Sequence, residues 1–380
     1  MPNPTFASLG IPEVLERSLR ARRLREPFPI QTEAIPPALA GRDVLGRAPT
    51  GSGKTLAFGI PMVSRCPVAD PQHPTGLVLA PTRELADQVA DELTLLAEPI
   101  GLVVERVYGG VSLHRQAEAL EAGVDIVVAC PGRLADLIER GALSLDSVEI
   151  LVIDEADRMA DMGFLPDVCA LIDQTPPDRQ TLLFSATLDG DVDTLVERYL
   201  SDPLAVHATE QTSEEATPSE VFFWTVPRNK RLDVTAQIAA ALGSTIVFCR
   251  TRHGADRVCD QLIARGLSAV ALHGDKRQSE RHEALEAFRD GAVKTLVATD
   301  VAARGLHIES VDGVIHFDTP ADDKDFIHRS GRTGRAGATG TVVMLIIPEA
   351  MPTAERLRRE LGGRYAIEPA DPGRLARRTR

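Results

Sequence analysis

A glycine-rich run near the amino end has the residue types and order of a phosphate-binding loop. The segment RDVLGRAPTGSGKTLAFGIP at 42–61 reads as a strand, a loop and a helix. Glycines let backbone N–H groups turn inward onto phosphate oxygens, while Lys54 can reach the β- and γ-oxygens and the Thr55 hydroxyl can hold Mg²⁺. A glycine-rich turn before an unrelated helix is the alternative. The residues predicted to line the phosphates are Thr50, Gly51, Ser52, Gly53, Lys54 and Thr55.

Two adjacent carboxylates follow an apolar run further along the chain. In LVIDEAD, Asp154 and Glu155 stand at the carboxyl end of a predicted buried strand, where open α/β sheets bind their ligands. There Asp154 would anchor Mg²⁺, mostly through water, and Glu155 would orient and deprotonate an attacking water. A solvated acidic helix start is the alternative, because Asp and Glu favour first turns. Together with the glycine-rich loop, the pair predicts a site that hydrolyses a nucleotide.

The overall composition limits how the chain could bind nucleic acid or a metal. A net charge of −13 argues against binding nucleic acid through a broad cationic surface. One Trp and three Tyr are too few for extensive base stacking. Contacts from backbone amides, helix N-termini and a few arginines stay open. The five cysteines form no C-x-x-C pair and no cluster with histidine at metal spacing, so neither zinc nor a disulfide framework is indicated.

The sequence carries no signal for export or for a membrane. The first residues, MPNPTFASLG, lack a basic start followed by an apolar run. No apolar segment approaches the ~18 residues needed to cross a bilayer. We therefore expect a cytoplasmic protein without membrane contact, and we expect it to be a monomer.

Short apolar runs alternate with helical stretches along the chain. The strands and helices that they predict must position the glycine-rich loop and the two carboxylates. LVLAP, DIVVA, EILVID and TLLFSA occur between 77 and 186, and TIVFC, SAVAL, KTLVAT, GVIHF and TVVMLII occur between 245 and 347. Continuous apolar strands that alternate with helices predict a parallel sheet covered on both faces, and hence the α/β class. The chain of 380 residues is long enough for two such units.

A stretch poor in large apolar side chains, at 201–220, marks the division between the two units. We predict a first domain at 1–205, a linker at 206–220, a second domain at 221–348 and a short C-terminal extension at 349–380.

The ordered motifs resemble those of the DEAD-box ATP-dependent RNA helicases of superfamily two. Asp154-Glu155-Ala156-Asp157 is the tetrad that names the family, and further family motifs occur in order between Phe6 and Thr341. The resemblance implies two tandem RecA-like domains, with ATP and Mg²⁺ as cofactors and RNA as the bound polymer. Because its C-terminal extension is short, the chain resembles a minimal, bacterial-type core of this family.

The resemblance also assigns roles in nucleotide reading and in coupling. Gln31, in PFPIQ, implies an amide that reads the adenine edge by paired hydrogen bonds. Ser185 and Thr187, together with Asp157, resemble the element that links hydrolysis to unwinding. The RNA contacts that the family implies are Pro81, Thr82, Arg83, Gly109, Gly110, Gly132 and Arg133 in the first domain, and Gln278, Arg281, Thr299 and Asp300 in the second.

HRSGRTGR, at 328–335, matches the family's arginine-finger motif. Arg332 and Arg335 are the implied fingers, because the charge of a transferred phosphoryl group needs a cation that arrives when the domains close. His328 and Arg304 are implied coupling residues, and Gly305 is implied to lie beside the nucleotide. A basic loop for generic phosphate binding is the alternative for this motif alone.

Three positions depart from the family pattern. Leu24 stands where many members place an aromatic ring on the adenine, which leaves base recognition to Gln31. Cys130 replaces the usual Thr before P-G-R and is a poorer hydrogen-bond donor, so one RNA phosphate contact is expected to be weaker. His307 replaces an Asp that would accept a hydrogen bond from a ribose.

These residues together predict an ATP-dependent RNA helicase that binds the RNA backbone with low sequence specificity and unwinds short duplexes locally. ATP would close the domains and hydrolysis would reopen them. An ATP-locked RNA clamp in a larger assembly would use the same machinery. A DNA helicase or translocase would share the glycine-rich loop and the acidic pair, although the D-E-A-D tetrad and the Gln31 motif favour RNA.

Overall fold

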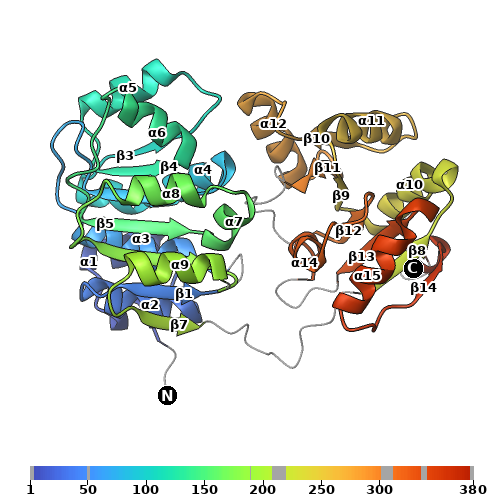
Figure 1. Cartoon of the computed structure of the whole chain (residues 1–380), viewed down its shortest axis with the longest axis horizontal. Coiled ribbons are helices and arrows are strands. Elements are labelled where there is room, and N and C mark those ends of the chain that lie inside the picture. Colours follow the sequence, from blue (N-terminus) through green and yellow to red (C-terminus); the bar gives the residue numbers. More distant parts are fainter. Residues whose placement is uncertain are drawn as a thin grey trace. The chain divides into compact units, whose positions relative to one another are not determined.

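Two compact units make up the chain, at Met1–Gln211 and Thr212–Arg380 (Figure 1). The computed structural model describes residues 4–48, 52–188, 190–207, 220–300, 311–334 and 340–376. Within these residues each unit contains one sheet of seven strands, and every strand pairing is parallel. The prediction of two α/β units with parallel sheets is confirmed.

The first sheet has the order β3-β4-β2-β5-β6-β1-β7. Its central strands are buried at every position because helices cover both faces. Its strands are β1 (Val44–Arg47), β2 (Gly76–Leu79), β3 (Val104–Val107), β4 (Ile126–Ala129), β5 (Ile150–Asp154), β6 (Gln180–Ser185) and β7 (Leu204–His207).

Two hydrophobic cores lie on the two faces of this sheet. On β5, Val152 belongs to one core and Ile153 to the other, as the alternation of a strand requires. One face is covered by α1 (Glu13–Ala21), α2 (Pro29–Leu39), α3 (Lys54–Arg65) and α4 (Arg83–Ala97), with η1 (Phe6–Leu9) and η2 (Glu98–Ile100). The other is covered by α5 (Leu113–Ala122), α6 (Pro131–Glu139), α7 (Ala156–Asp161), α8 (Leu165–Ile172) and α9 (Gly190–Tyr199).

The second sheet repeats the plan with the order β10-β11-β9-β12-β13-β8-β14. Its strands are β8 (Glu220–Thr225), β9 (Thr245–Cys249), β10 (Ala269–Leu272), β11 (Thr295–Thr299), β12 (Gly313–His316), β13 (Thr341–Ile346) and β14 (Ile367–Pro369). The helices are η3 (Arg228–Lys230), α10 (Arg231–Leu242), α11 (Arg252–Ile263), α12 (Gln278–Arg289), α14 (Asp323–Ser330), η4 (Pro348–Ala350), α15 (Met351–Glu360) and α16 (Gly373–Ala376).

The C-terminal segment completes the second unit. β14 pairs with β8, and the indole of Trp224 donates to Glu368 at 3.2 Å. Leu375 of α16 is buried in a core of this unit. Residues predicted to form an extension after 348 therefore supply one strand of the second sheet. The predicted linker at 206–220 lies largely outside the described residues, so the domain limits stay a prediction.

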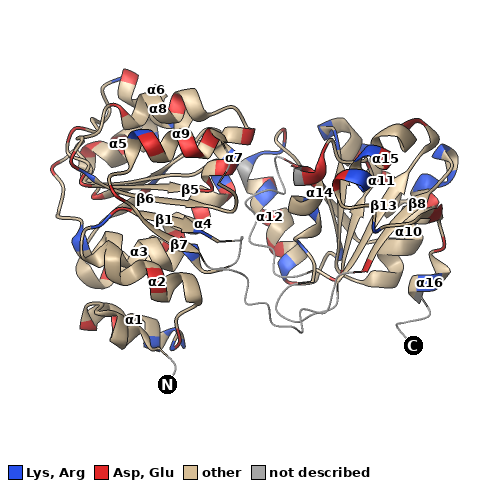
Figure 2. Ribbon diagram, turned by 60° about the horizontal axis from the view of Figure 1, so that its bottom comes forward, with Lys and Arg blue, Asp and Glu red and all other residues tan. Residues whose placement is uncertain are grey.

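Because the strands are parallel, the residues predicted to bind and hydrolyse the nucleotide lie at one edge of the first sheet. Arg47 is paired with Ser185, and Asp154 with Phe184, so β1, β5 and β6 end side by side. Figure 2 shows acidic and basic residues interspersed along the helices of both units. Within the described residues, no helix is both long and apolar enough to span a membrane.

Candidate nucleotide site and nucleic-acid interface

The nucleotide loop starts at the carboxyl end of β1. Ala48 follows the strand, and its N–H donates to the carbonyl of Ser185 at 3.0 Å, which extends the β1–β6 pairing by one residue. Residues 49–51, with the predicted Thr50 and Gly51, lie outside the described part of the chain. The helix that receives the loop is α3.

Lys54 is the buried cation of this loop. It is 7% exposed, and its Nζ donates to the carbonyl of Ala48 at 3.1 Å. Thr55 follows in the first turn of α3, where helix N–H groups lack intrahelical acceptors. Ser52 and Gly53 lead directly into this turn. A cation beside a helix N-terminus is an arrangement that binds phosphate.

Gln31 packs against the loop with both ends of its amide engaged. Its Oε1 accepts from the N–H of Phe28 at 2.8 Å, and its Nε2 donates to the carbonyl of Gly53 at 2.9 Å. Gly53 has φ +84°, and a Cβ there would collide with Gln31 Nε2 and lie 2.7 Å from the Phe28 ring. Glycine is therefore required at this position. The Gln31 amide keeps a second N–H and a second lone pair for the predicted adenine contact.

An exposed aromatic ring stands beside the loop, although not at Leu24. Leu24 is partly buried against the first core. Phe28, four residues later, is 56% exposed and contacts the Gly53 position. A ring in this place offers an apolar face to a base held by Gln31. Phe28 was not predicted from the sequence as part of the site.

Asp154 ends β5 and is buried. Burial raises its pKa to about 7, the charge of Lys54 opposes this shift, and Glu155 adds to it. Among the described residues, no group of three or more His, Cys, Asp or Glu could hold a metal ion. Mg²⁺ would therefore need phosphate oxygens and water besides Asp154 and Thr55, which is its usual coordination. The residues present fit that mode, since a cation favours the ionised carboxylate.

Glu155 occupies the tight turn between β5 and α7. Its backbone is left-handed, with φ +51° and ψ +53°, a conformation that costs a non-glycine residue about 1–2 kcal/mol. Its Oε2 accepts from Arg158 Nη1 at 2.9 Å. Because the two side chains are only 9% and 6% exposed, the carboxylate is fixed in one orientation.

Asp157 joins the acidic turn to the end of β6. Its carboxylate accepts from the N–H of Thr187 at 2.9 Å and from the Thr187 hydroxyl at 3.1 Å. Its own N–H donates to Ser185 Oγ at 3.2 Å. The structure thus brings together Asp157, Ser185 and Thr187, the three coupling residues that were predicted in the first unit.

Two arginines meet at the turn Gly109-Gly110. A Cβ on Gly110 would collide with Arg83 Nη1, and one on Gly109 would lie 3.9 Å from Arg133 Nη2. The loops concerned follow β2, β3 and β4, which are neighbours in the sheet. This edge gathers the predicted RNA residues of the first unit, Pro81, Thr82, Arg83, Gly109, Gly110, Gly132 and Arg133.

Cys130 is the N-cap residue of α6, and its side chain makes no capping hydrogen bond. Burial raises the pKa of its thiol to about 12, so the thiol stays protonated. The weaker phosphate contact expected at this position stays a prediction.

Asp300 is held by an internal cation in the second unit. Its carboxylate accepts from Arg329 Nε at 2.5 Å and from Arg329 Nη2 at 2.7 Å, a bidentate pair. The buried Arg329 also donates to the carbonyl of Asp318 at 2.9 Å. Thr299, the last residue of β11, directly precedes Asp300 in the sequence and is buried. An oriented Asp300 at a strand end suits a contact with a hydroxyl.

The remaining predicted residues of the second unit lie on two helices and a turn. Arg281 is buried on α12, which begins at Gln278. His328 lies on α14, and Arg332 is buried just after it, with its carbonyl accepting from the N–H of Val311 at 3.1 Å. The side chain of Gln278, and residues Arg304, Gly305, His307 and Arg335, lie outside the described part of the chain.

Three further partners of the site were not predicted from the sequence. Arg158 stands three residues after Glu155, a helix spacing at which charged side chains pair, so a signal existed. Arg329 lies inside HRSGRTGR, next to residues that were predicted. Gln116 accepts from Arg133 Nη1 at 2.8 Å, and no local pattern indicates this contact because its partners come from other elements.

Two family profiles match this chain in the expected order. The profile described as DEAD/DEAH box helicase matches residues 28–195, and the helicase conserved C-terminal domain matches residues 230–337.

Individual relatives extend the comparison. The chain is 44% identical over 371 residues to the chloroplastic DEAD-box ATP-dependent RNA helicase 3A of Zea mays, with 95% of this chain and 49% of the relative covered. It spans about half the length of that relative. It is 39% identical over 376 residues to the DEAD-box ATP-dependent RNA helicase CshA of Geobacillus kaustophilus, with 98% of this chain and 78% of the relative covered. Among solved structures, S. cerevisiae Dbp5 bound to RNA and ADP BeF3 matches with a TM-score of 0.81, 26% identity and coverage of 98% and 99%.

Proposed function

Because this chain belongs to the DEAD-box ATP-dependent RNA helicases, we propose that it hydrolyses ATP to ADP and phosphate in the presence of RNA and uses the cycle to separate short RNA duplexes. The observation that carries the proposal is the arrangement of the predicted residues at one sheet edge. There Lys54 and Asp154 are both buried, the N–H of Glu155 donates to the Asp154 carboxylate at 3.0 Å, and Asp157 ties this turn to Ser185 and Thr187.

In the proposed nucleotide site, the chain holds ATP from its phosphates to its base. Lys54 and the N–H groups at the start of α3 bind the β- and γ-phosphates, with Thr50, Gly51, Ser52 and Gly53 as the cradle. Gln31, which is held by its bonds to Phe28 and Gly53, uses its second N–H and its second lone pair to donate to and accept from the adenine edge. Mg²⁺, when bound near Thr55 and Asp154, neutralises charge that develops on the phosphate oxygens.

Glu155 is the proposed base. Its buried carboxylate is oriented by Arg158, so it can hold an attacking water in one position and accept its proton. The proposed fingers, Arg332 and Arg335, add positive charge to the transferred phosphoryl group, and Gly305 is proposed as a further nucleotide-binding residue. Arg304 and His328, together with Asp157, are proposed to couple ATP hydrolysis to unwinding.

RNA is the proposed polymer partner, held through phosphates and sugars. Arg83 and Arg133 supply positive charge beside Gly109-Gly110, where the lack of side chains lets a backbone approach closely. Arg281, Thr299 and Asp300, with Gln278, are the proposed contacts of the second unit. Dbp5, which is 26% identical to this chain, has been solved bound to RNA and ADP BeF3, and this supports the choice of RNA. Cytoplasmic location and a monomeric state stay predictions from the sequence.

The experiment compares the ATPase rate of the full chain without polymer, with single-stranded RNA, and with DNA of matched sequence. A second arm follows strand separation of a short RNA duplex. The proposal expects stimulation by RNA but not by DNA, and ATP-dependent strand separation. Equal stimulation by DNA would indicate a DNA translocase instead, and RNA-stimulated hydrolysis without strand separation would indicate an RNA clamp.

A further inference from the structure

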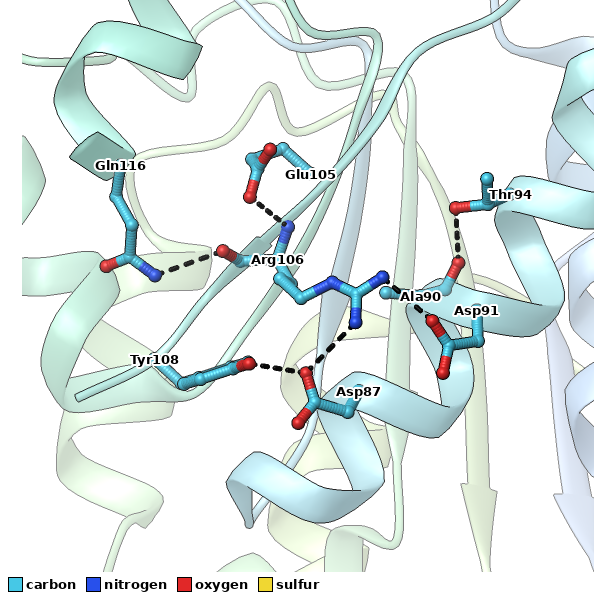
Figure 3. Close-up of polar contacts among 8 residues, drawn as sticks. All are labelled: Asp87, Ala90, Asp91, Thr94, Glu105, Arg106, Tyr108 and Gln116. Carbon is cyan, nitrogen blue, oxygen red and sulfur yellow. Dashed lines mark hydrogen bonds and ion pairs between the residues drawn. The ribbon is translucent and has the colours of Figure 1, made fainter. Parts of the chain in front are cut away.

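A cluster of polar side chains ties β3 to α4 in the first unit (Figure 3). Arg106 projects from β3, its Nη1 lies 3.2 Å from Asp87 Oδ1, and its Nη2 lies 2.8 Å from Asp91 Oδ1. The hydroxyl of Tyr108 donates to the same oxygen of Asp87. The Asp87 carboxylate on α4 therefore binds two side chains, that of Arg106 on β3 and that of Tyr108 directly after β3. Arg106 and Asp87 are half-buried, where such contacts hold better than on an open surface.

A second arm of this cluster reaches Arg133. The carbonyl of Arg106 accepts from Gln116 Nε2 at 3.1 Å, and Gln116 Oε1 accepts from Arg133 Nη1 at 2.8 Å. Gln116 is only 5% exposed. The same Arg133 nitrogen donates to the carbonyl of Val111 at 3.1 Å. The guanidinium of Arg133 is thus fixed by two acceptors that follow the Gly109-Gly110 turn, and one of them, Gln116, also binds Arg106, which precedes the turn.

The cluster ends at three of the loops proposed to bind RNA. Tyr108 directly precedes Gly109, Asp87 lies one helical turn after Arg83 on α4, and Gln116 contacts Arg133. The turn has no side chains of its own, so its position depends on what fixes the residues around it. Fixed neighbours lower the ordering cost that RNA binding would otherwise carry.

We propose that Gln116, Tyr108, Arg106 and Asp87 are positioning residues, which hold the Gly109-Gly110 turn and the Arg133 guanidinium in the arrangement that binds RNA phosphates. This rests on the RNA binding proposed above. The four side chains bind one another and the loops, and RNA itself contacts the turn and the arginines.

The test measures RNA-stimulated ATPase of the full chain at several salt concentrations. Gln116→Met keeps the length of the side chain but removes both hydrogen bonds, and Tyr108→Phe removes only the hydroxyl. Arg133→Met serves as the reference for a lost phosphate contact. Glu92→Gln is the matched control, because it breaks the Arg22–Glu92 ion pair of 2.7 Å on the same helix α4, outside this cluster.

We expect Gln116→Met to raise the KM for RNA about fivefold, the effect of roughly one lost hydrogen bond, and Tyr108→Phe to raise it less. The kcat at saturating RNA and the ATPase rate without RNA should stay within about twofold of the wild type, as for any change confined to RNA affinity. The plot of log KM against log salt should become shallower by about 0.7 in Arg133→Met, which loses one phosphate contact, and by up to about 0.7 in Gln116→Met, which weakens the same contact. Combining Gln116→Met with Arg133→Met should add little to Arg133→Met alone, because the two residues act as one unit.

Three outcomes would overturn the proposal. An unchanged KM for RNA in both Gln116→Met and Tyr108→Phe is the first. A rise in Glu92→Gln as large as in Gln116→Met is the second, because it would mean that the loss of a contact outside this cluster has the same effect. Full additivity of Gln116→Met and Arg133→Met is the third. A wild-type chain that neither binds RNA nor responds to it would instead contradict the proposed function, so the two failures are distinguishable.

Discussion

Arg158 donates a hydrogen bond of 2.9 Å to Glu155, and this pair is almost fully buried. Glu155 is the proposed base, and its left-handed backbone already limits where its side chain can point. An ion pair at such a residue orients the carboxylate, and it also competes with the attacking water for the carboxylate oxygens. Arg158 is therefore expected to affect the rate of hydrolysis without touching ATP.

Arg158→Gln should lower kcat on the order of tenfold, because Glu155 would lose its fixed orientation. It should also destabilise the first unit by about 3 kcal/mol, since the buried carboxylate of Glu155 would lose this ion pair. Thermal unfolding and steady-state ATPase assays measure the two effects. Arg198→Gln is the control: its ion pair with Asp173 is just as short at 2.7 Å but half exposed, so the loss should stay below about 1 kcal/mol. A wild-type kcat in Arg158→Gln would remove Arg158 from this role.

Gly53→Ala should abolish tight ATP binding. The new Cβ would meet Gln31 Nε2 and the Phe28 ring in a left-handed backbone, so the loop and the adenine reader would both have to move. Gly10→Ala separates these effects, because Gly10 has φ +78° but no atom within 4 Å of its Cβ position. Gly10→Ala should cost about 1 kcal/mol of stability and leave ATP affinity unchanged. Calorimetric titration with ATP compares the two variants, and similar affinities would contradict the proposed loop.

Thr187→Val should separate hydrolysis from unwinding. The change removes the hydroxyl donor to Asp157 but keeps the backbone N–H bond to the same carboxylate. Loss of about one hydrogen bond at a coupling contact should slow strand separation on the order of tenfold, while RNA-stimulated ATPase stays within about threefold. Parallel assays of both activities on one preparation give the ratio. Equal losses in both would show that Thr187 serves catalysis rather than coupling.

The stability of the second unit should fall as the pH drops below about 6.5. Burial, aided by the charge of Arg329, holds the pKa of His316 well below 6.5, so this ring stays neutral in the folded protein. The unfolded chain takes up a proton in that range, so the unfolding free energy should decrease by about 1.4 kcal/mol per pH unit from this group. Trp224, the single tryptophan, is buried in this unit and reports its unfolding by fluorescence. His316→Phe should flatten the pH dependence by that amount, and an unchanged slope would contradict the assignment.

The alternation of apolar strands and helices predicted both sheets, because parallel strands buried on both faces leave an unambiguous pattern. It also predicted that Asp154 and Ser185 stand at strand ends, since each lies at or near the end of an apolar run. The contribution of β14 to the second sheet was not predicted, because three residues at an edge carry little apolar signal.

Contacts between side chains from distant elements were much harder to predict. Asp300 was expected to face RNA, but nothing in its sequence neighbourhood indicates that Arg329, on another element, holds both of its oxygens. Phe28 was taken as part of a motif rather than as an exposed ring, since exposure depends on the packing of α2 against α3. Gln116 is an ordinary helix residue in the sequence, and only the positions of β3 and α6 give it a role.

Glu155→Gln tests the proposed chemistry most directly, in paired assays of ATPase rate and ATP-dependent RNA binding. The substitution keeps the size of the side chain but removes its ability to accept a proton. We predict that RNA-stimulated hydrolysis is lost while RNA still binds in the presence of ATP. Hydrolysis at the wild-type rate in Glu155→Gln would contradict the proposal that Glu155 activates the attacking water.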